Sequence, residues 1–294
     1  MSLKLKPISE QVFVITGASS GIGMVTARTA ARQGAKVVVA ARSAQKLNTL
    51  VEELQRSGAE ALAIKADVSK RDEVEGIAQA AIRQFGRIDT WVNNAGLSIY
   101  GRLDEVEDGD SRRLFDINFW GVVNGSLVAL QHLRKQGGAL INVGSEVSEA
   151  VVPLQGMYSA SKHAVKGFTD ALRVEIEEVD KAPISITLIQ PTAVETPFPR
   201  HARNYMDREP KLPDPKIDPQ KVADAIVEAA TKHTHHVKVG MNAKINTFMS
   251  NNAPTLADHM AAKYVDKQQT DKSPQQPAGT LYEPGEVIDV LQHA

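Results

Sequence analysis

The chain has 294 residues and 42% hydrophobic side chains, which is typical of a globular protein with one continuous core. Its formal net charge of −1 provides no long-range attraction to polyanions, so we expect no nucleic-acid partner. The absence of cysteine excludes disulfides, thiolate catalysis and cysteine-ligated zinc. No apolar run has the length of a signal-peptide core or a membrane span, so we expect a cytoplasmic protein without a transmembrane segment.

Short β-branched runs alternate with helical segments along most of the chain. Strands are expected at residues 12–15, 36–40, 61–65, 88–92, 140–143, 184–189 and 236–239. Helices are expected at residues 21–33, 43–56 with Ser43 as N-cap, 69–85, 110–135, 157–179 and 219–232. This alternation without hairpin signals predicts an α/β fold: a Rossmann-type doubly wound parallel sheet of about seven strands, with helices on both faces.

Two stretches break the alternation. Residues 197–219 are rich in proline and charge and are expected to form a mobile lid over the substrate. Residues 241–294 are polar, with proline and glutamine clusters, and are expected to be a C-terminal extension on the surface of a single catalytic domain, residues 1–240. Leu256, Met260 and Tyr264 recur there at helical spacing, which leaves open contact with a partner subunit or with a membrane surface.

A glycine-rich turn follows the first expected strand and leads directly into a helix. It reads Thr-Gly-Ala-Ser-Ser-Gly-Ile-Gly from residue 16. Glycines let the backbone approach a pyrophosphate, whose charge is met by free amides at the helix N-terminus. The turn alone is weak support, because its spacing differs from G-x-G-x-x-G and tight turns need glycine anyway. The candidate cofactor-binding residues in it are Gly17, Ser19, Ser20, Gly21, Ile22 and Gly23.

Further motifs follow in order. They are Asp67-Val68 after the third strand, Asn93-Asn94-Ala95-Gly96 after the fourth, Asn118 in the long helix, Ser145 after the fifth strand, and Tyr158-x-x-x-Lys162. Together with the glycine turn, this series resembles the short-chain dehydrogenase/reductase family, over roughly residues 11–240. The resemblance implies that Asp67 accepts a hydrogen bond from the adenine amino group, that Val68 contacts the ring, and that Asn94, Ala95 and Gly96 line the ribose and diphosphate.

The end of the second strand predicts the choice of cofactor. An acidic residue there would bind the ribose 2′-hydroxyl, whereas this chain has Ala41 and Arg42. A guanidinium suits bidentate contact with a phosphate, so we expect NADP(H) over NAD(H), with the Ser19 hydroxyl as a second phosphate contact. The alternative is that Arg42 is a solvated charge at a strand end.

Tyr158 and Lys162 lie four residues apart on an expected helix, so both project from one face. A free phenol has a pKa of ~10, and a nearby ammonium favours its ionised form. We therefore expect Tyr158 to act as general acid in carbonyl reduction and as general base in the reverse direction. Each residue alone could equally be a packing or surface group.

The resemblance adds roles around this pair. It implies that Lys162 also holds the nicotinamide ribose, that Ser145, thirteen residues before Tyr158, binds the substrate oxygen, and that Asn118 binds a water linked to Lys162. After the sixth strand the family usually has Pro-Gly, whereas this chain reads Pro-Thr-Ala-Val-Glu-Thr from residue 191. The missing glycine puts the local path in doubt, but Pro191, Val194 and Thr196 are still expected to contact the nicotinamide end.

The motif spacing places several apolar residues near the pocket: Leu97, Val147, Val152 and Leu154. They favour a moderately hydrophobic ketone, aldehyde or alcohol over a charged sugar. Arg200, His201 and Arg203 are as easily solvated loop residues. By the resemblance, the two longest helices pack against a second subunit, which predicts a homodimer or homotetramer, and the apolar second half of residues 110–135 predicts burial nearly all round.

The histidines at 233, 235 and 236 lack carboxylates nearby in the sequence, so we expect no metal site. Two rival functions remain. A nucleotide-sugar epimerase or dehydratase would have a different glycine spacing and a larger C-terminal domain. A non-catalytic nucleotide-sensing or interaction protein would not need Asn118, Ser145, Tyr158 and Lys162 together. The sequence therefore favours an NADPH-dependent oxidoreductase.

Overall fold

A parallel sheet of seven strands forms the centre of the protein. The computed structural model describes residues 4–285. Strand order is β3-β2-β1-β4-β6-β7-β9, and every pairing is parallel. The strands are β1 Val12–Thr16, β2 Lys36–Ala41, β3 Ala61–Lys65, β4 Thr90–Asn93, β6 Gly138–Val143, β7 Ile184–Pro191 and β9 His236–Val239. The predicted Rossmann-type fold is confirmed.

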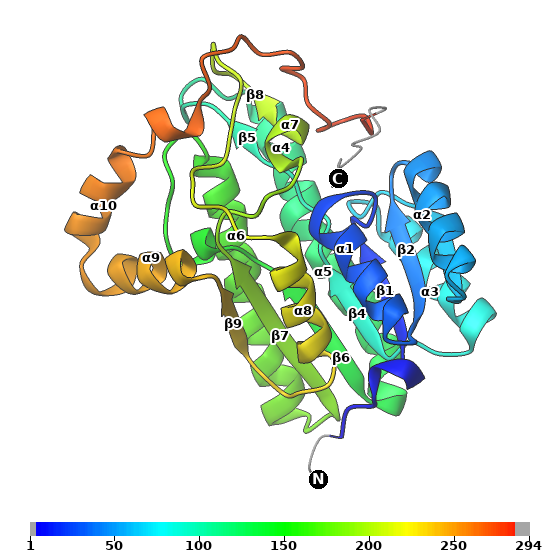
Figure 1. The fold of residues 1–294 in the computed structure, drawn as a ribbon. Coiled ribbons are helices and arrows are strands. Elements are labelled where there is room, and N and C mark those ends of the chain that lie inside the picture. The colour runs from blue at the N-terminus through cyan, green and yellow to red at the C-terminus, as the bar shows by residue number, and fades with distance from the viewer. Residues whose placement is uncertain (1–3, 286–294) are drawn as a thin grey trace.

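Helices cover both faces of the sheet (Figure 1). One face carries α1 Gly21–Arg32, α2 Ala44–Arg56 and α8 Pro219–Ala229, which bury their apolar sides in one core cluster. The other face carries α3 Arg71–Phe85, α5 Gly121–Gln136 and α6 Gly156–Arg173, which share a second cluster. Because both faces are covered, the central strands are buried along their length: all five residues of β1 and all eight of β7 are buried.

The helix predicted at residues 110–135 is formed by three consecutive helical segments. They are α4 Asp108–Phe115, a π-helical turn η2 Asp116–Trp120, and α5. The expectation of burial nearly all round is wrong for one stripe, since Trp120 is 52% exposed and Leu127 is 36% exposed. Helix α6 likewise continues into a π-helical segment, η4 Val174–Val179. Apolar content predicts an unsolvated face, but it does not tell a core face from a surface left for a partner.

The segment between β7 and α8 carries its own structure. It contains α7 Phe198–His201 and β8 Arg203–Asn204, which pairs in parallel with β5 Ile99–Tyr100 as a small second sheet. Several of its residues line the cleft described below. Its role as a substrate lid remains a prediction.

The chain beyond β9 returns to the domain. Helices α9 Met241–Asn252 and α10 Pro254–Ala262 lie at one side of the sheet, and the last described residues pass over the top, near α4 and α7 (Figure 1). Gln268, Thr280 and Leu281 are buried, so this part of the extension packs on the Rossmann-type fold. Within residues 4–285, no helix is long and apolar enough to cross a membrane.

Candidate active site

A cleft opens where the parallel strands end, and the predicted site residues gather there. Its lining includes Gly17, Ser19, Ser20, Gly21, Ile22, Arg42, Asp67, Val68, Asn94, Ala95, Gly96, Ser145, Tyr158, Lys162, Pro191, Val194 and Thr196. Gly23 and Asn118 are not part of this lining but lie next to Gly17 and Leu97, which are. The carboxyl ends of neighbouring parallel strands meet at one edge of a sheet, which is the usual ligand site of such folds.

Close backbone packing explains the glycines of the turn. Gly17 has φ +68°, and a Cβ there would lie 2.6 Å from Ala95 Cα. A Cβ on Gly23 would lie 2.4 Å from the Gly17 carbonyl oxygen. The Asn94 side chain donates to the Thr16 and Gly17 carbonyls at 3.0 and 3.2 Å, which fixes the turn against the end of β4. The first residues of α1, Gly21 and Ile22, thus line the cleft, and the first amides of a helix are a usual site for an anion.

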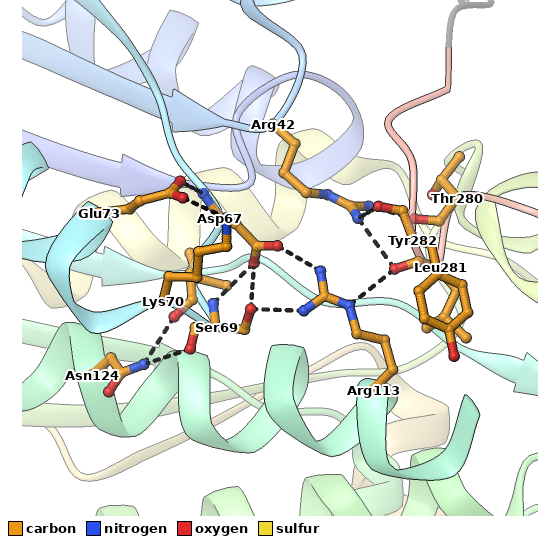
Figure 2. Close-up of polar contacts among 11 residues, drawn as sticks. Arg42, Asp67, Ser69, Lys70, Glu73, Arg113, Asn124, Thr280, Leu281 and Tyr282 are labelled. Carbon is orange, nitrogen blue, oxygen red and sulfur yellow. Dashed lines mark hydrogen bonds and ion pairs between the residues drawn. The ribbon is translucent and has the colours of Figure 1, made fainter. Parts of the chain in front are cut away.

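The end of the cleft beyond β2 and β3 holds a network of charges (Figure 2). Arg113 of α4 contacts Asp67 Oδ2 at 2.5 Å and donates to Ser69 Oγ at 2.7 Å. Arg42 donates to the main-chain carbonyls of Leu281 and Tyr282 at 3.1 and 3.0 Å. Burial raises the pKa of Asp67, but hydrogen bonds from Arg113 and Ser69 outweigh it and leave that pKa below its usual range. Sequence reasoning identified Arg42 and Asp67 but missed Arg113 and the tail.

Ser145 and Tyr158 meet in the cleft. Ser145 ends the turn after β6 and caps the short helix η3 Glu146–Ser148, its Oγ accepting from Val147 N at 3.3 Å. Burial raises the pKa of Tyr158 to about 12, the nearby Ser145 hydroxyl opposes this rise, and the Glu146 carboxyl adds to it. Both side chains therefore line the same cleft.

Lys162 lies beneath Tyr158 on α6 and is 4% exposed. Its Nζ donates to the Val143 carbonyl at 2.8 Å and lies 5.8 Å from the centre of the Tyr158 ring. Burial lowers the pKa of Lys162 to about 8. Gly96 lies beside this amine: a Cβ there would lie 3.3 Å from Asn118 Oδ1 and 3.7 Å from Nζ.

Asn118 lies in the π-helical turn η2 and is fully buried. Its Oδ1 accepts from Leu97 N at 2.9 Å, while its Nδ2 donates to Leu97 O at 2.9 Å and to Ser161 Oγ at 3.1 Å. The side chain thus fixes the backbone next to Gly96. The water contact that the resemblance implied for Asn118 remains a prediction.

Apolar groups form the other end of the cleft. The lining includes Leu97, Val147 and Val152 as predicted, but not Leu154. Residues that sequence reasoning missed add to this wall: Pro197, Phe198, Leu212 and Pro213. The Phe198 ring lies 5.5 Å from that of Tyr158. These four lie in the segment after β7, whose path no spacing rule predicts.

The charged residues of that segment differ in their surroundings. His201 lines the cleft, and Arg200 is exposed. Arg203 points away from the cleft lining, because its Nε donates to Asp110 Oδ2 at 2.9 Å.

The segment after β7 keeps a defined path without the family's glycine. Thr192 N donates to the Val239 carbonyl at 3.1 Å, and Thr192 Oγ1 donates to Glu146 Oε1 at 3.0 Å. Burial raises the pKa of Glu146, although hydrogen bonds from Asn246 and Thr192 oppose this. Glu146 lines the cleft and is a site residue that the sequence motifs did not indicate. Asn246 belongs to α9 and donates to Glu146 Oε2 at 2.9 Å, so the extension also contacts η3.

The family follows from comparison with known proteins. The model of the short chain dehydrogenase family matches residues 11–206. This chain belongs to that family. An uncharacterized oxidoreductase of Bacillus subtilis (strain 168), YxnA, is 43% identical over 288 residues, covering 96% of this chain and 81% of that protein. That match extends beyond residue 206 into the C-terminal extension.

Solved structures agree with this assignment. A short-chain dehydrogenase/reductase from Burkholderia phymatum, in complex with NAD, has a TM-score of 0.74 at 26% identity and covers 91% of this chain and 99% of its own. An alcohol dehydrogenase from Thermococcus sibiricus, complexed with 5-hydroxy-NADP, has a TM-score of 0.69 at 28% identity, covering 78% and 95%. The chain is thus a short-chain dehydrogenase/reductase of the oxidoreductase class, and related folds hold both NAD and NADP types of cofactor.

The buried amine predicts a pH dependence of stability. The pKa of Lys162 is about 8 in the folded chain and near its ordinary 10.5 in the unfolded chain. The unfolded state therefore binds more protons between these values, so burying the amine destabilises the fold fully below about pH 8 and less as the pH rises towards 10.5. Without nucleotide, urea unfolding at pH 7.0 and 9.5 should show Lys162→Met stabilised relative to wild type at the lower pH, with the difference shrinking at the higher. Parallel pH curves would contradict this.

Proposed function

We propose that this protein is an NADPH-dependent oxidoreductase that interconverts a moderately hydrophobic ketone or aldehyde and the corresponding alcohol. The observation that carries the proposal is the convergence of Ser145, Tyr158 and Lys162 in one cleft with the glycine turn. When bound, the dinucleotide would supply or accept the hydride. The chain supplies proton transfer, orientation and stabilisation of negative charge.

The role of each group follows from its surroundings. Tyr158 is the proton donor to a nascent alkoxide, and Ser145, whose hydroxyl lies near it in the same cleft, positions the same oxygen. Lys162, which lines the cleft beside Gly96, would contact the nicotinamide ribose and, when protonated, would favour the ionised phenol. Asn118 positions the backbone next to Gly96 and, by family resemblance, a water in the proton path.

The charge distribution at the far end of the cleft supports NADPH. Arg42 and Lys46 line the cleft there with Ser19 and Ser43, whose hydroxyls suit a phosphate. Asp67 is the carboxylate that would repel a 2′-phosphate, and Arg113 already pairs with it. A 2′-phosphate would thus meet a cationic rather than an anionic surface.

Substrate class and assembly are proposed from the apolar surfaces. The wall formed by Leu97, Val147, Val152 and Phe198 favours an apolar substituent on the carbonyl carbon. The exposed Trp120 and Leu127, on the helices that the family resemblance assigns to subunit contact, support a homodimer or homotetramer. A cytoplasmic location is part of the same proposal.

Replacing Tyr158 by Phe tests the chemistry. The variant should keep nucleotide binding but lose about 10²–10⁴-fold in kcat, because a general acid is removed while the ring remains. Nucleotide oxidation followed at 340 nm against a panel of ketones and aldehydes measures this, with Tyr264→Phe as a control outside the cleft. Tight nucleotide binding without Tyr158-dependent turnover would favour the rival function, a nucleotide sensor.

Replacing Arg42 by Asp tests the cofactor. Wild type should have the higher kcat/KM with NADPH, and Arg42→Asp should lower that value by about 100-fold, because a charge-assisted contact is lost and a carboxylate repels the 2′-phosphate. The same variant should shift preference towards NADH. Arg56→Asp makes the same charge change at the exposed end of α2 and should leave the ratio unaltered. A wild-type preference for NADH would refute the proposal.

A further inference from the structure

The C-terminal segment Thr280–Gly285 is anchored across the nucleotide end of the cleft. Thr280 N donates to the His201 carbonyl at 2.8 Å, and the Tyr282 hydroxyl donates to Asp110 Oδ1 at 2.8 Å. The Leu281 side chain is fully buried, in the apolar cluster that also contains Val68 and Leu114. Gly279, just before the segment, has φ +54°, and a Cβ there would lie 2.3 Å from the Ala202 carbonyl oxygen. Specific contacts at both ends therefore hold the segment in place.

The segment turns three successive carbonyls towards the two arginines (Figure 2). Arg42 donates to the carbonyls of Thr280, Leu281 and Tyr282, and Arg113 Nε donates to that of Leu281 at 3.4 Å. A guanidinium has five N–H donors, so within residues 4–285 these three acceptors leave Arg42 donors for a further ligand. Carbonyls are neutral, so these three contacts orient the guanidinium without cancelling its charge. The carboxylates that act on Arg42 are Asp67, which Arg113 already pairs, and Glu283 of the segment itself.

Thr280, Pro284 and Gly285 also line the cleft itself. The segment therefore forms a wall of the same cavity that the glycine turn and Arg42 line. Arg113 reaches both the segment and Asp67, and so links the wall to the carboxylate expected at the adenine. A side chain already held in one conformation loses less entropy when it binds a ligand.

Building on the proposed NADPH specificity, we propose that Thr280–Gly285 is part of the cofactor site and, with Arg113, determines recognition of the 2′-phosphate. The segment holds Arg42 at the position where a phosphate monoester on the adenosine ribose would lie. Arg113 is a positioning residue: it neutralises Asp67 and fixes the Leu281 carbonyl. NADH lacks this phosphate and gains little from the arrangement.

The test disrupts the anchoring of the segment within the full chain. Leu281→Asn places a neutral polar group where the anchor is buried, and Leu256→Asn makes the same change on a leucine of α10 that is 53% exposed. Fluorescence titration gives Kd for NADPH and NADH. Leu281→Asn should weaken NADPH binding about tenfold, which corresponds to ~1.4 kcal/mol, and change NADH binding much less. Leu256→Asn should bind both as wild type does.

If Leu281→Asn folds, any other change in the two Kd values overturns this inference. Equal weakening towards both nucleotides would show a structural role only, and tighter NADPH binding would show that the segment obstructs the site. If Leu281→Asn does not fold, Arg113→Met in the full chain gives the second measurement, with the same selective loss expected. A wild-type chain that binds neither nucleotide, or prefers NADH, would instead refute the proposed function.

A second inference concerns the far edge of the sheet, at the start of β7 and β9. His233 Nε2 and His235 Nε2 lie 3.5 and 3.8 Å from Glu177 Oε2 of η4. The three donor atoms all lie within 4.8 Å of one another. The expectation of no metal site rested on the lack of carboxylates near these histidines in the sequence. That reason is wrong, because the fold brings the Glu177 carboxylate next to them. Glu177 precedes them by more than fifty residues.

Neighbouring groups orient these side chains. Ile186 N donates to Glu177 Oε1 at 2.6 Å, which leaves Oε2 towards the histidines. Ser185 Oγ lies 3.2 Å from His233 Nδ1, which leaves Nε2 towards the carboxylate. Such outer contacts are usual for metal ligands. Zinc bonds of 2.0–2.2 Å in a tetrahedron separate ligand atoms by roughly 3.3 Å, close to the distances seen here.

The geometry points to a zinc-type site formed by Glu177, His233 and His235, with an open fourth position for water. It lies at the amino ends of the strands, away from the cleft, so its effect would be to tie the loop before β9 to η4. His236 is not part of it, because its Nε2 contacts Asp170 at 2.6 Å.

Zinc chloride titrated into the full chain, free of any polyhistidine tag and treated with EDTA, tests this site. One zinc per chain should bind by calorimetry and raise Tm by a few degrees. Both effects should be lost in Glu177→Gln and His235→Asn, and retained in His259→Asn, which alters an exposed histidine of α10. No binding by wild type, or binding that all four proteins share, would overturn the site.

Discussion

The burial of the Lys162 amine is the constraint around which the cleft is organised. A charged amine that is 4% exposed costs much of its hydration. Within residues 4–285 its one hydrogen bond is to the Val143 carbonyl, and no carboxylate contacts it. Three features surround this group: the end of β6, Gly96 and the buried Asn118. The fold therefore holds an amine whose pKa is lowered by its burial.

Much of this could be predicted from sequence because the signals are local. Each strand is a short apolar run ended by a turn, and Ser43 caps α2 through Lys46 N as its position suggests. Tyr158 and Lys162 lie on one helix, so their relation depends only on helical geometry. The order of β1, β4 and β6 then places the loops after them at one edge of the sheet. The motifs describe the cleft well wherever such regular elements carry them.

What the sequence did not predict depends on contacts between distant segments. Arg113 reaches Asp67 only because α4 lies beside the end of β3, and Glu177 meets His233 only because η4 passes the start of β9. The buried Leu281 is a single apolar residue in a polar tail, so composition predicted an appendage where the structure has an anchor. Trp120 shows the reverse error, since an apolar residue on a long helix was expected in the core.

Burial separates two groups whose ordinary pKa values are close. The pKa of Tyr158 rises to about 12 and that of Lys162 falls to about 8, so the cleft favours a neutral phenol and weakens the charge on the amine. A positive charge entering beside the ring would lower the pKa of the phenol, whereas hydroxyls in contact with the amine would restore its hydration. In the proposed function, each change would move the pair towards the charged state that proton transfer needs. Proton transfer would then be limited to the cleft that holds a ligand with both features.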